Sequence, residues 1–201
     1  MASSIVEQIE RLRAIFASHG FAMPLAAPAT PAQIRAVEAE TSITLDEALR
    51  EFYELTDGSA GAYWLAIMTD ELTRCSMLSL SECLSEWRQW LYEDEAAQLA
   101  EWGPTEPGRD SRIRPEFFVW RGWLPIADFN GGGTKLFFDA DPAPGGIHGQ
   151  MIVYQHDPDA VYWRAASFLE LLTLSNDLLE AHFEELMFVD GEPVCSTPLL
   201  P

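Results

Sequence analysis

Four side chains that could ligate a metal ion lie close together in the second half of the sequence. Asp128, Asp139, Asp141 and His148 fall at the ends of β-rich runs and in the turns beside them. Carboxylates gathered in this way bind hard cations such as calcium or magnesium. Aspartate is also common in turns, because its carboxylate accepts hydrogen bonds from nearby backbone amides. The spacing is not that of an EF-hand, so turn chemistry is favoured, and a metal- or small-ligand-binding enzyme is the alternative.

Other catalytic patterns are weak. The glycines of Asn130–Lys135 precede a β-rich run and lack the order of a phosphate-binding loop, which favours a turn between two strands. The His156-Asp157 pair resembles one found in some metal-dependent phosphohydrolases, but the further helical ligands of such sites are missing. The sequence contains no Gly-x-Ser-x-Gly elbow for a nucleophilic serine. We therefore expect no catalytic residue and no cofactor.

The charge of the chain restricts its partners. The 201 residues include 32 Asp and Glu against 12 Lys and Arg, for a formal net charge of −20. Phosphate binding needs clustered Lys and Arg, so nucleic acid is disfavoured, and anionic membrane is disfavoured for the same reason. A basic protein, in contrast, would be attracted and steered to such a surface. Acidity also serves solubility alone, so charge by itself does not decide the function.

Three features predict a soluble, cytoplasmic protein. Hydrophobic residues make up 48% of the chain, which is enough for a sizeable core, yet no run approaches the roughly 20 apolar residues of a membrane helix. The stretch Met1–Phe16 lacks the basic start and apolar run of a signal peptide. Cys75, Cys83 and Cys195 are odd in number and widely spaced, which predicts reduced, partly buried thiols.

Helix signals predominate in the first half of the chain and strand signals in the second. Apolar residues recur at helical spacing behind capping pairs such as Thr30–Gln33 and Thr44–Glu47. Short β-rich runs separated by turn-rich segments follow. We predict helices over 3–18, 30–40, 44–57, 79–101 and from Ser167 onward, and strands over 63–68, 123–127, 135–139, 150–155 and 161–163.

This order of elements predicts an α+β fold with a central, largely antiparallel sheet and helices packed on it. The length fits a single domain over 1–201, with its first helix at 3–18. The polar loop at 103–115, rich in Pro and Gly, is the best candidate for a mobile segment.

Several motifs then occur in a recognisable order. A Trp-x-Pro strand from Trp123 precedes a Gly-containing turn and a strand ending in Asp139. Gly149-Gln150 with an apolar strand follows, and Ser167-Phe168 opens the last helix. Together these motifs resemble the SUKH superfamily, specifically its Smi/Knr-type branch, over residues 30–174. The sequence departs from that pattern at Thr44-Leu45, where Leu-Pro is typical, at Asp57, where Asn is usual, and in a long insertion over 80–115.

The resemblance implies the SUKH (Smi/Knr-like) α+β fold and a protein-binding role. Many bacterial members of the superfamily are immunity proteins that bind and neutralise toxins, often nucleases. Fungal relatives are regulatory and scaffolding proteins in cell-wall synthesis, and the family has no established shared catalytic residues. We therefore expect a non-catalytic immunity protein with a cognate toxin, or alternatively a regulatory scaffold without a toxin partner.

Nuclease toxins are commonly basic because they bind phosphate, so carboxylates and bulky aromatic side chains are the expected contacts. An acidic surface would accelerate association, and a few buried anchors would supply affinity. Tryptophan is enriched among such anchors, although it is also a large core residue and core packing is the favoured role. The candidate contacts are Trp90, Glu93, Asp94, Glu95, Trp102, Asp139, Asp141, Asp157 and Asp159.

Overall fold

The expected α+β architecture is confirmed by a computed structural model of the chain. The structure describes residues 4–69, 71–90, 109–116, 119–129, 133–156, 159–189 and 192–193. A six-stranded sheet runs in chain order from β1 to β6, and every neighbouring pair of its strands is antiparallel. Its strands are β1 (Tyr63–Met68), β2 (Leu72–Met77), β3 (Trp123–Asp128), β4 (Thr134–Asp139), β5 (Gln150–Gln155) and β6 (Ala160–Ala165).

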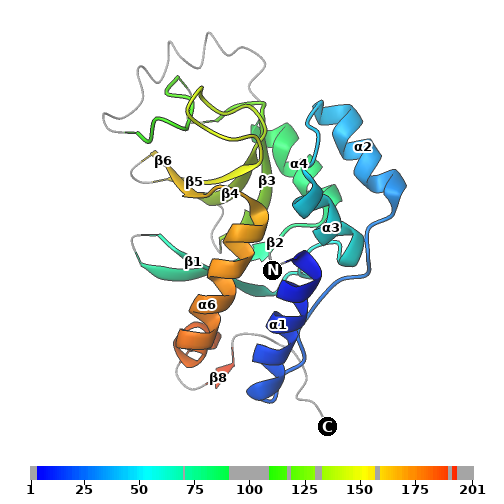
Figure 1. The fold of residues 1–201 in the computed structure, drawn as a ribbon, viewed down its shortest axis with the longest axis vertical. Helices are drawn as coiled ribbons and strands as arrows, with labels where there is room; N and C mark the ends of the chain where they lie inside the picture. Colours follow the sequence, from blue (N-terminus) through cyan, green and yellow to red (C-terminus); the bar gives the residue numbers. More distant parts are fainter. Residues whose placement is uncertain are drawn as a thin grey trace.

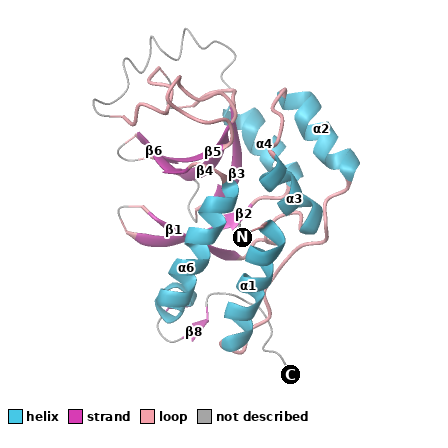
Figure 2. Ribbon diagram, viewed as in Figure 1, coloured by secondary structure: helices cyan, strands magenta, loops and turns pink. Residues whose placement is uncertain are grey.

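Helices cover one face of this sheet, and the end of one helix, at Trp90, reaches the other face. Figure 1 shows α1, α3 and α6 side by side, and the three pack together and against the strands. Figure 2 separates this helical layer from the strands by colour. The helices are α1 (Ile5–Ser18), α2 (Pro31–Thr41), α3 (Glu47–Leu55), α4 (Leu80–Trp90) and α6 (Phe168–Met187), and a short ribbon of β7 (Phe188–Val189) and β8 (Glu192–Pro193) follows. None of these helices is long and apolar enough to cross a membrane.

Capping residues explain where the helices begin. The predicted capping box of α2 is confirmed, since the Thr30 hydroxyl accepts the Gln33 N–H while the Gln33 side chain accepts the Thr30 N–H. The predicted start of α3 at Thr44 is wrong, because Asp46 is the cap and accepts the Leu49 N–H at 2.8 Å. Leu45 stays outside the helix, where it is buried and donates its N–H to Glu38.

Strand β2 was missed by the sequence prediction. Its sequence, LTRCSM, lacks the apolar alternation of a half-buried strand. The strand forms because it pairs along its length with β1, whereas it meets β3 only through Ser76↔Asp128 and Met77↔Ala127. The predicted extension of the fourth helix from Trp90 to 101 lies outside the described residues.

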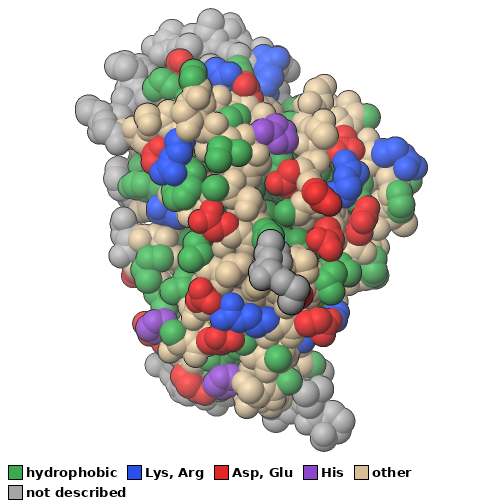
Figure 3. Space-filling view, in the orientation of Figure 1, with side chains coloured by type: hydrophobic (Ala, Val, Ile, Leu, Met, Phe, Trp, Pro, Cys, Tyr) green, Lys and Arg blue, Asp and Glu red, His purple; other side chains and the backbone are tan. Residues whose placement is uncertain are grey.

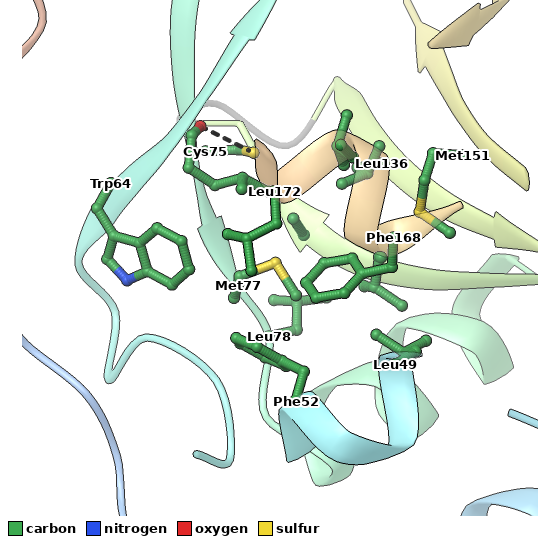
Figure 4. Packing of buried hydrophobic residues seen from close by; sticks show 14 of the residues in the cluster. Leu49, Phe52, Trp64, Cys75, Met77, Leu78, Leu136, Met151, Phe168 and Leu172 are labelled. Atoms are coloured by element: carbon green, nitrogen blue, oxygen red, sulfur yellow. Dashed lines mark hydrogen bonds between the residues drawn. The ribbon is translucent and has the colours of Figure 1, made fainter. Parts of the chain in front are cut away.

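Apolar side chains fill both faces of the sheet. The larger cluster lies under the helices, and Figure 4 shows Phe52 of α3 and Phe168 of α6 packed beside Met77 of β2. The smaller cluster covers the opposite face and includes Phe137 and Ile152. The alternation of strands explains the division, because successive side chains of a strand point to opposite faces.

The thiols of the described residues are buried, as expected. Cys75 and Cys83 are free, and Cys75 donates to the Leu65 carbonyl at 3.5 Å (Figure 4). Burial raises the pKa of Cys83 to about 12, so this thiol stays protonated and unreactive near neutral pH. Cys195 lies outside the described residues.

Candidate partner-binding surface

The solvent-facing side of α3 carries three carboxylates. Glu47 and Glu54 are exposed and Glu51 is half-buried, and their spacing of four and three residues places them along one side of the helix. None of the three forms an ion pair with any other described residue. We call these three residues the acidic face of α3. Figure 3 shows Asp and Glu side chains gathered over α3, between α2 and α6.

The acidic face of α3 has a rigid base. The opposite side of the helix buries Leu49, Phe52 and Tyr53, which belong to the larger apolar cluster. The Tyr53 hydroxyl also donates to the Leu78 carbonyl at 3.1 Å. Because the backbone beneath the carboxylates is fixed by packing, a partner could dock on them with little ordering of the chain.

Most basic side chains are engaged in ion pairs, and one of them, Arg50, lies on α3 itself. All 12 Lys and Arg of the chain are among the described residues. On the neighbouring helix α2, Glu38 pairs with Arg50 of α3 and Glu40 pairs with Arg88 of α4, so those carboxylates are neutralised. Further ion pairs join Arg11 to Asp177 and Glu180, Arg13 to Glu10, Arg112 to Asp110, Arg114 to Asp141, and Lys135 to Glu86 and Asp128. Glu47, Glu51 and Glu54 therefore keep their charge without an ion pair among the described residues, although Arg50 lies between Glu47 and Glu51 on the same helix.

The opposite face of the sheet has a different character. Trp90, Trp120 and Trp163 are half-buried and pack against its smaller apolar cluster. The guanidinium of Arg112 stacks on the Trp163 ring, 3.5 Å from its centroid, and that of Arg114 lies 5.4 Å from the centroid of Trp120. The tryptophans therefore lie among arginine–carboxylate pairs and not on a purely acidic surface.

A comparison with known protein families complements this geometry. Residues 28–174 match the SMI1/KNR4 family (SUKH-1). The chain belongs to the SMI1/KNR4 family. The SUKH resemblance of the sequence motifs is thereby confirmed, and the family is generally non-catalytic. The SMI1/KNR4 match contains the whole six-stranded sheet, whereas α1 precedes it and α6 extends beyond it. No curated protein matches the chain.

Within this SMI1/KNR4 fold, the expected contact residues are scattered. Trp90 ends α4 with its ring 5.2 Å from that of Tyr154, so it packs on the outer sheet face. Asp141 pairs with Arg114 and accepts the Trp120 indole N–H at 3.0 Å. Asp159 is exposed and accepts hydrogen bonds from the Tyr154 hydroxyl and the His156 ring. Glu93, Asp94, Glu95, Trp102 and Asp157 lie outside the described residues.

Asp139 requires a correction, because it is not a surface residue. Its side chain is fully buried, with an exposed fraction of 0%. Its carboxylate accepts hydrogen bonds from Gln150 Nε2 at 2.8 Å and from the Asp141 N–H at 3.1 Å. Burial raises the pKa of this carboxyl to about 6. Asp139 therefore holds two loops together inside the SMI1/KNR4 fold and is not available to a docking partner.

The four residues of the alternative metal site are also separated. Asp128 lies opposite Lys135 near the start of β4, with Lys135 Nζ 2.9 Å from Asp128 Oδ1, whereas Asp139 ends that strand. Asp141 is held by Arg114, and the exposed His148 ring lies against Phe138. Throughout the described ranges, no three His, Cys, Asp or Glu residues gather in a way that could hold a metal ion.

The acidic face of α3 was missed by the sequence prediction. The sequence prediction selected the continuous acidic run at 93–95, whereas the carboxylates of α3 are separated by apolar residues and by Arg50. The amphipathic pattern over 47–54 was a usable signal, since the apolar positions needed for burial leave Glu47, Glu51 and Glu54 on the opposite side.

Proposed function

We propose that this member of the SMI1/KNR4 family is a non-catalytic immunity protein that captures a basic, nuclease-type toxin on the acidic face of α3. The observation that carries the proposal is that Glu47, Glu51 and Glu54 share one side of a rigid helix without an ion pair among the described residues. The family match supports a protein-binding role, and the net charge of −20 supports a cationic partner.

The position of the positive charge on such a toxin explains how binding would neutralise its activity. A nuclease presents Lys and Arg at its phosphate-binding site. Carboxylates on α3 would occupy that site in place of phosphate, and the long-range attraction would accelerate capture. Inhibition then needs no reaction, because the bound immunity protein blocks the access of nucleic acid to the toxin.

Two of the remaining candidate contacts lie on the other face of the sheet, away from α3. Asp159 keeps an exposed carboxylate beside His156, and Trp90 offers part of an aromatic ring at the end of α4. Trp90 packs on the outer-face cluster and Asp159 bonds Tyr154 of that same cluster, whereas α3 packs on the other face, so we assign the contact to the carboxylates of α3 and not to these two residues.

The test begins with capture of the partner from the native cell, using the full chain as bait. The partner is then identified and expressed in a bacterial host, with and without this chain. We expect a basic protein that arrests growth alone and is harmless when co-expressed. An acidic partner would contradict the proposal. A partner without any effect on growth would favour the regulatory scaffold instead.

A variant carrying Glu47→Gln, Glu51→Gln and Glu54→Gln serves as the direct control in the growth assay. These substitutions preserve side-chain size and remove only charge from three side chains that make no ion pair among the described residues. We expect the variant to protect the host less well than the wild type when the toxin is abundant. Equal protection by the variant and the wild type would show that α3 does not contribute to the contact with the toxin.

A further inference from the structure

A second feature lies on the other side of α6, between the two edge strands of the sheet. Because β1 and β6 are the ends of the strand order, each has one side without a strand neighbour in that sheet. A groove with a cavity volume of about 290 Å³ lies there, lined by Ala66, Ile67 and Met68 of β1 and by Leu171, Leu174 and Leu178 of α6. The lining is therefore largely apolar and comes from both the sheet edge and the long helix.

The apolar lining reaches the surface. Among the described residues, the large hydrophobic side chains that are exposed are Val6, Met68, Ile147 and Leu174. Two of them, Met68 and Leu174, with exposed fractions of 50% and 44%, line this one groove. Exposed apolar side chains that gather in one hollow are typical of interaction sites, whereas scattered ones are ordinary.

The groove is preformed by a contact between its two walls. The Ala66 N–H, on the free side of β1, donates to the Ser175 hydroxyl of α6 at 2.8 Å, and Ser175 is fully buried. This bond fixes the sheet edge against the helix, so the space does not have to open when a side chain enters. A rigid apolar hollow of this kind is the usual setting of an interface anchor.

The net charge of the helix beside the groove favours a cationic partner. Helix α6 carries Glu170, Asp177, Glu180, Glu184 and Glu185 but no Lys or Arg. Arg164 and Asp177 line the groove with opposite charges, and Arg11 bridges Asp177 and Glu180, so the negative excess lies farther along α6, at Glu170, Glu184 and Glu185. Figure 3 shows apolar side chains near α6 and carboxylates over α3 on the same face of the molecule.

We infer that this groove receives a large apolar side chain, Phe or Leu, presented between Lys or Arg residues of the partner. The inference rests on the proposed function and deepens it, because it names the anchor that complements electrostatic capture by α3. The groove volume of about 290 Å³ lies at the lower limit of pockets for drug-sized ligands, which measure roughly 300–1,000 Å³. It therefore suits one or two side chains.

Two capped peptides test the groove without knowledge of the toxin. The probe is acetyl-Lys-Lys-Phe-Leu-Lys-Lys-amide and its match is acetyl-Lys-Lys-Ser-Ser-Lys-Lys-amide, which has the same charge. The full chain is titrated with each peptide while methyl resonances are followed by NMR. The methyls of Ala66, Met68 and Leu174 are expected to shift and saturate with the Phe-Leu peptide alone. Equal responses to both peptides, or no response at these methyls, overturn the inference.

Matched variants assign the response to the groove. Leu174→Ser removes an apolar wall, and Ile147→Ser removes an exposed apolar side chain that does not line the groove. Leu174→Ser is expected to lower the affinity for the Phe-Leu peptide about tenfold, in line with the loss of one buried aliphatic contact. Ile147→Ser is expected to leave this affinity unchanged. Equal losses in the two variants would exclude the groove as the site.

The triple Gln variant of α3 separates this inference from the proposed function. Loss of charge on α3 lowers the affinity of both peptides alike, and the preference for Phe-Leu over Ser-Ser persists if the groove is the anchor site. A preference that persists while toxin capture fails leaves the groove as a peptide site and rejects the immunity role. Toxin capture by a protein that shows no preference for Phe-Leu over Ser-Ser would keep the immunity role and overturn the groove as the anchor site.

Discussion

Asp139 shows how a single buried carboxylate can organise two loops. It accepts hydrogen bonds from Gln150 Nε2 and from the Asp141 N–H, and Gln150 Nε2 also donates to the Arg112 carbonyl at 2.8 Å. Arg114 in turn bonds Asp141, so the segment at 109–116 and the turn after β4 are joined through this one group. Because water is excluded from the site, the charged form of Asp139 is disfavoured in the folded protein.

The titration of Asp139 gives a prediction with a defined sign. Its pKa is about 6 in the folded protein and about 3.9 in the unfolded chain, so the folded state binds the proton more tightly. The stabilisation from this group is complete below the unfolded pKa and is lost as pH rises through 6. The free energy of unfolding of the wild type, relative to Asp139→Asn, should rise by about 1 kcal/mol from pH 7 to pH 5.

Urea unfolding of both proteins at pH 5, 6 and 7 measures this difference. The comparison with Asp139→Asn cancels the titration of the other carboxylates, which is essential in a chain of net charge −20. A difference that stays constant over this range, or that shrinks as pH falls, would mean that Asp139 is not the buried acid described above.

At the scale of elements, the sequence predicts those features that residues close together in the chain determine. The capping pair Thr30–Gln33 predicts the start of α2 because both groups lie within one turn. Strand β2 is different, because its partner strand and not its own pattern makes it a strand. The burial of Asp139 is likewise set by segments distant in sequence that cover its end of β4, so an aspartate at a strand end was taken for a surface residue.

The contact between α6 and β1 gives a prediction at this scale. Ser175→Ala leaves the buried Ala66 N–H without its acceptor, which should lower the free energy of unfolding by about 1–3 kcal/mol. Thr173→Ala is the matched control in the same helix, because the Thr173 hydroxyl only donates to the Leu169 carbonyl one turn earlier. Its effect should stay within about 0.5 kcal/mol.

Chemical denaturation of the two variants beside the wild type distinguishes these outcomes. Equal losses of stability would show that the tie between the sheet edge and α6 contributes nothing beyond an ordinary helical hydroxyl. In that case, the hydrogen bond between Ala66 and Ser175 would no longer support a rigid groove between β1 and β6.

At the scale of the whole molecule, excess charge and fold have separate roles. The fold rests on apolar clusters on both faces of the sheet, and the basic side chains are largely engaged in ion pairs. Carboxylates left without such pairs contribute little to stability and instead set the field that a partner meets. In the proposal, the acidic face of α3 attracts the basic partner, and the groove beside α6 binds an apolar side chain of that partner as an anchor.

The most direct test of this account is the association rate with the captured partner, measured by stopped flow at increasing salt. The Glu47/Glu51/Glu54 to Gln variant is compared with a second triple, Glu10→Gln, Glu71→Gln and Glu116→Gln, which removes the same charge elsewhere. At low salt, we predict a roughly tenfold slower association for the α3 variant, a loss below about twofold for the control, and convergence of all rates at high salt. Rates that ignore salt, or equal losses in both triples, would contradict capture by α3.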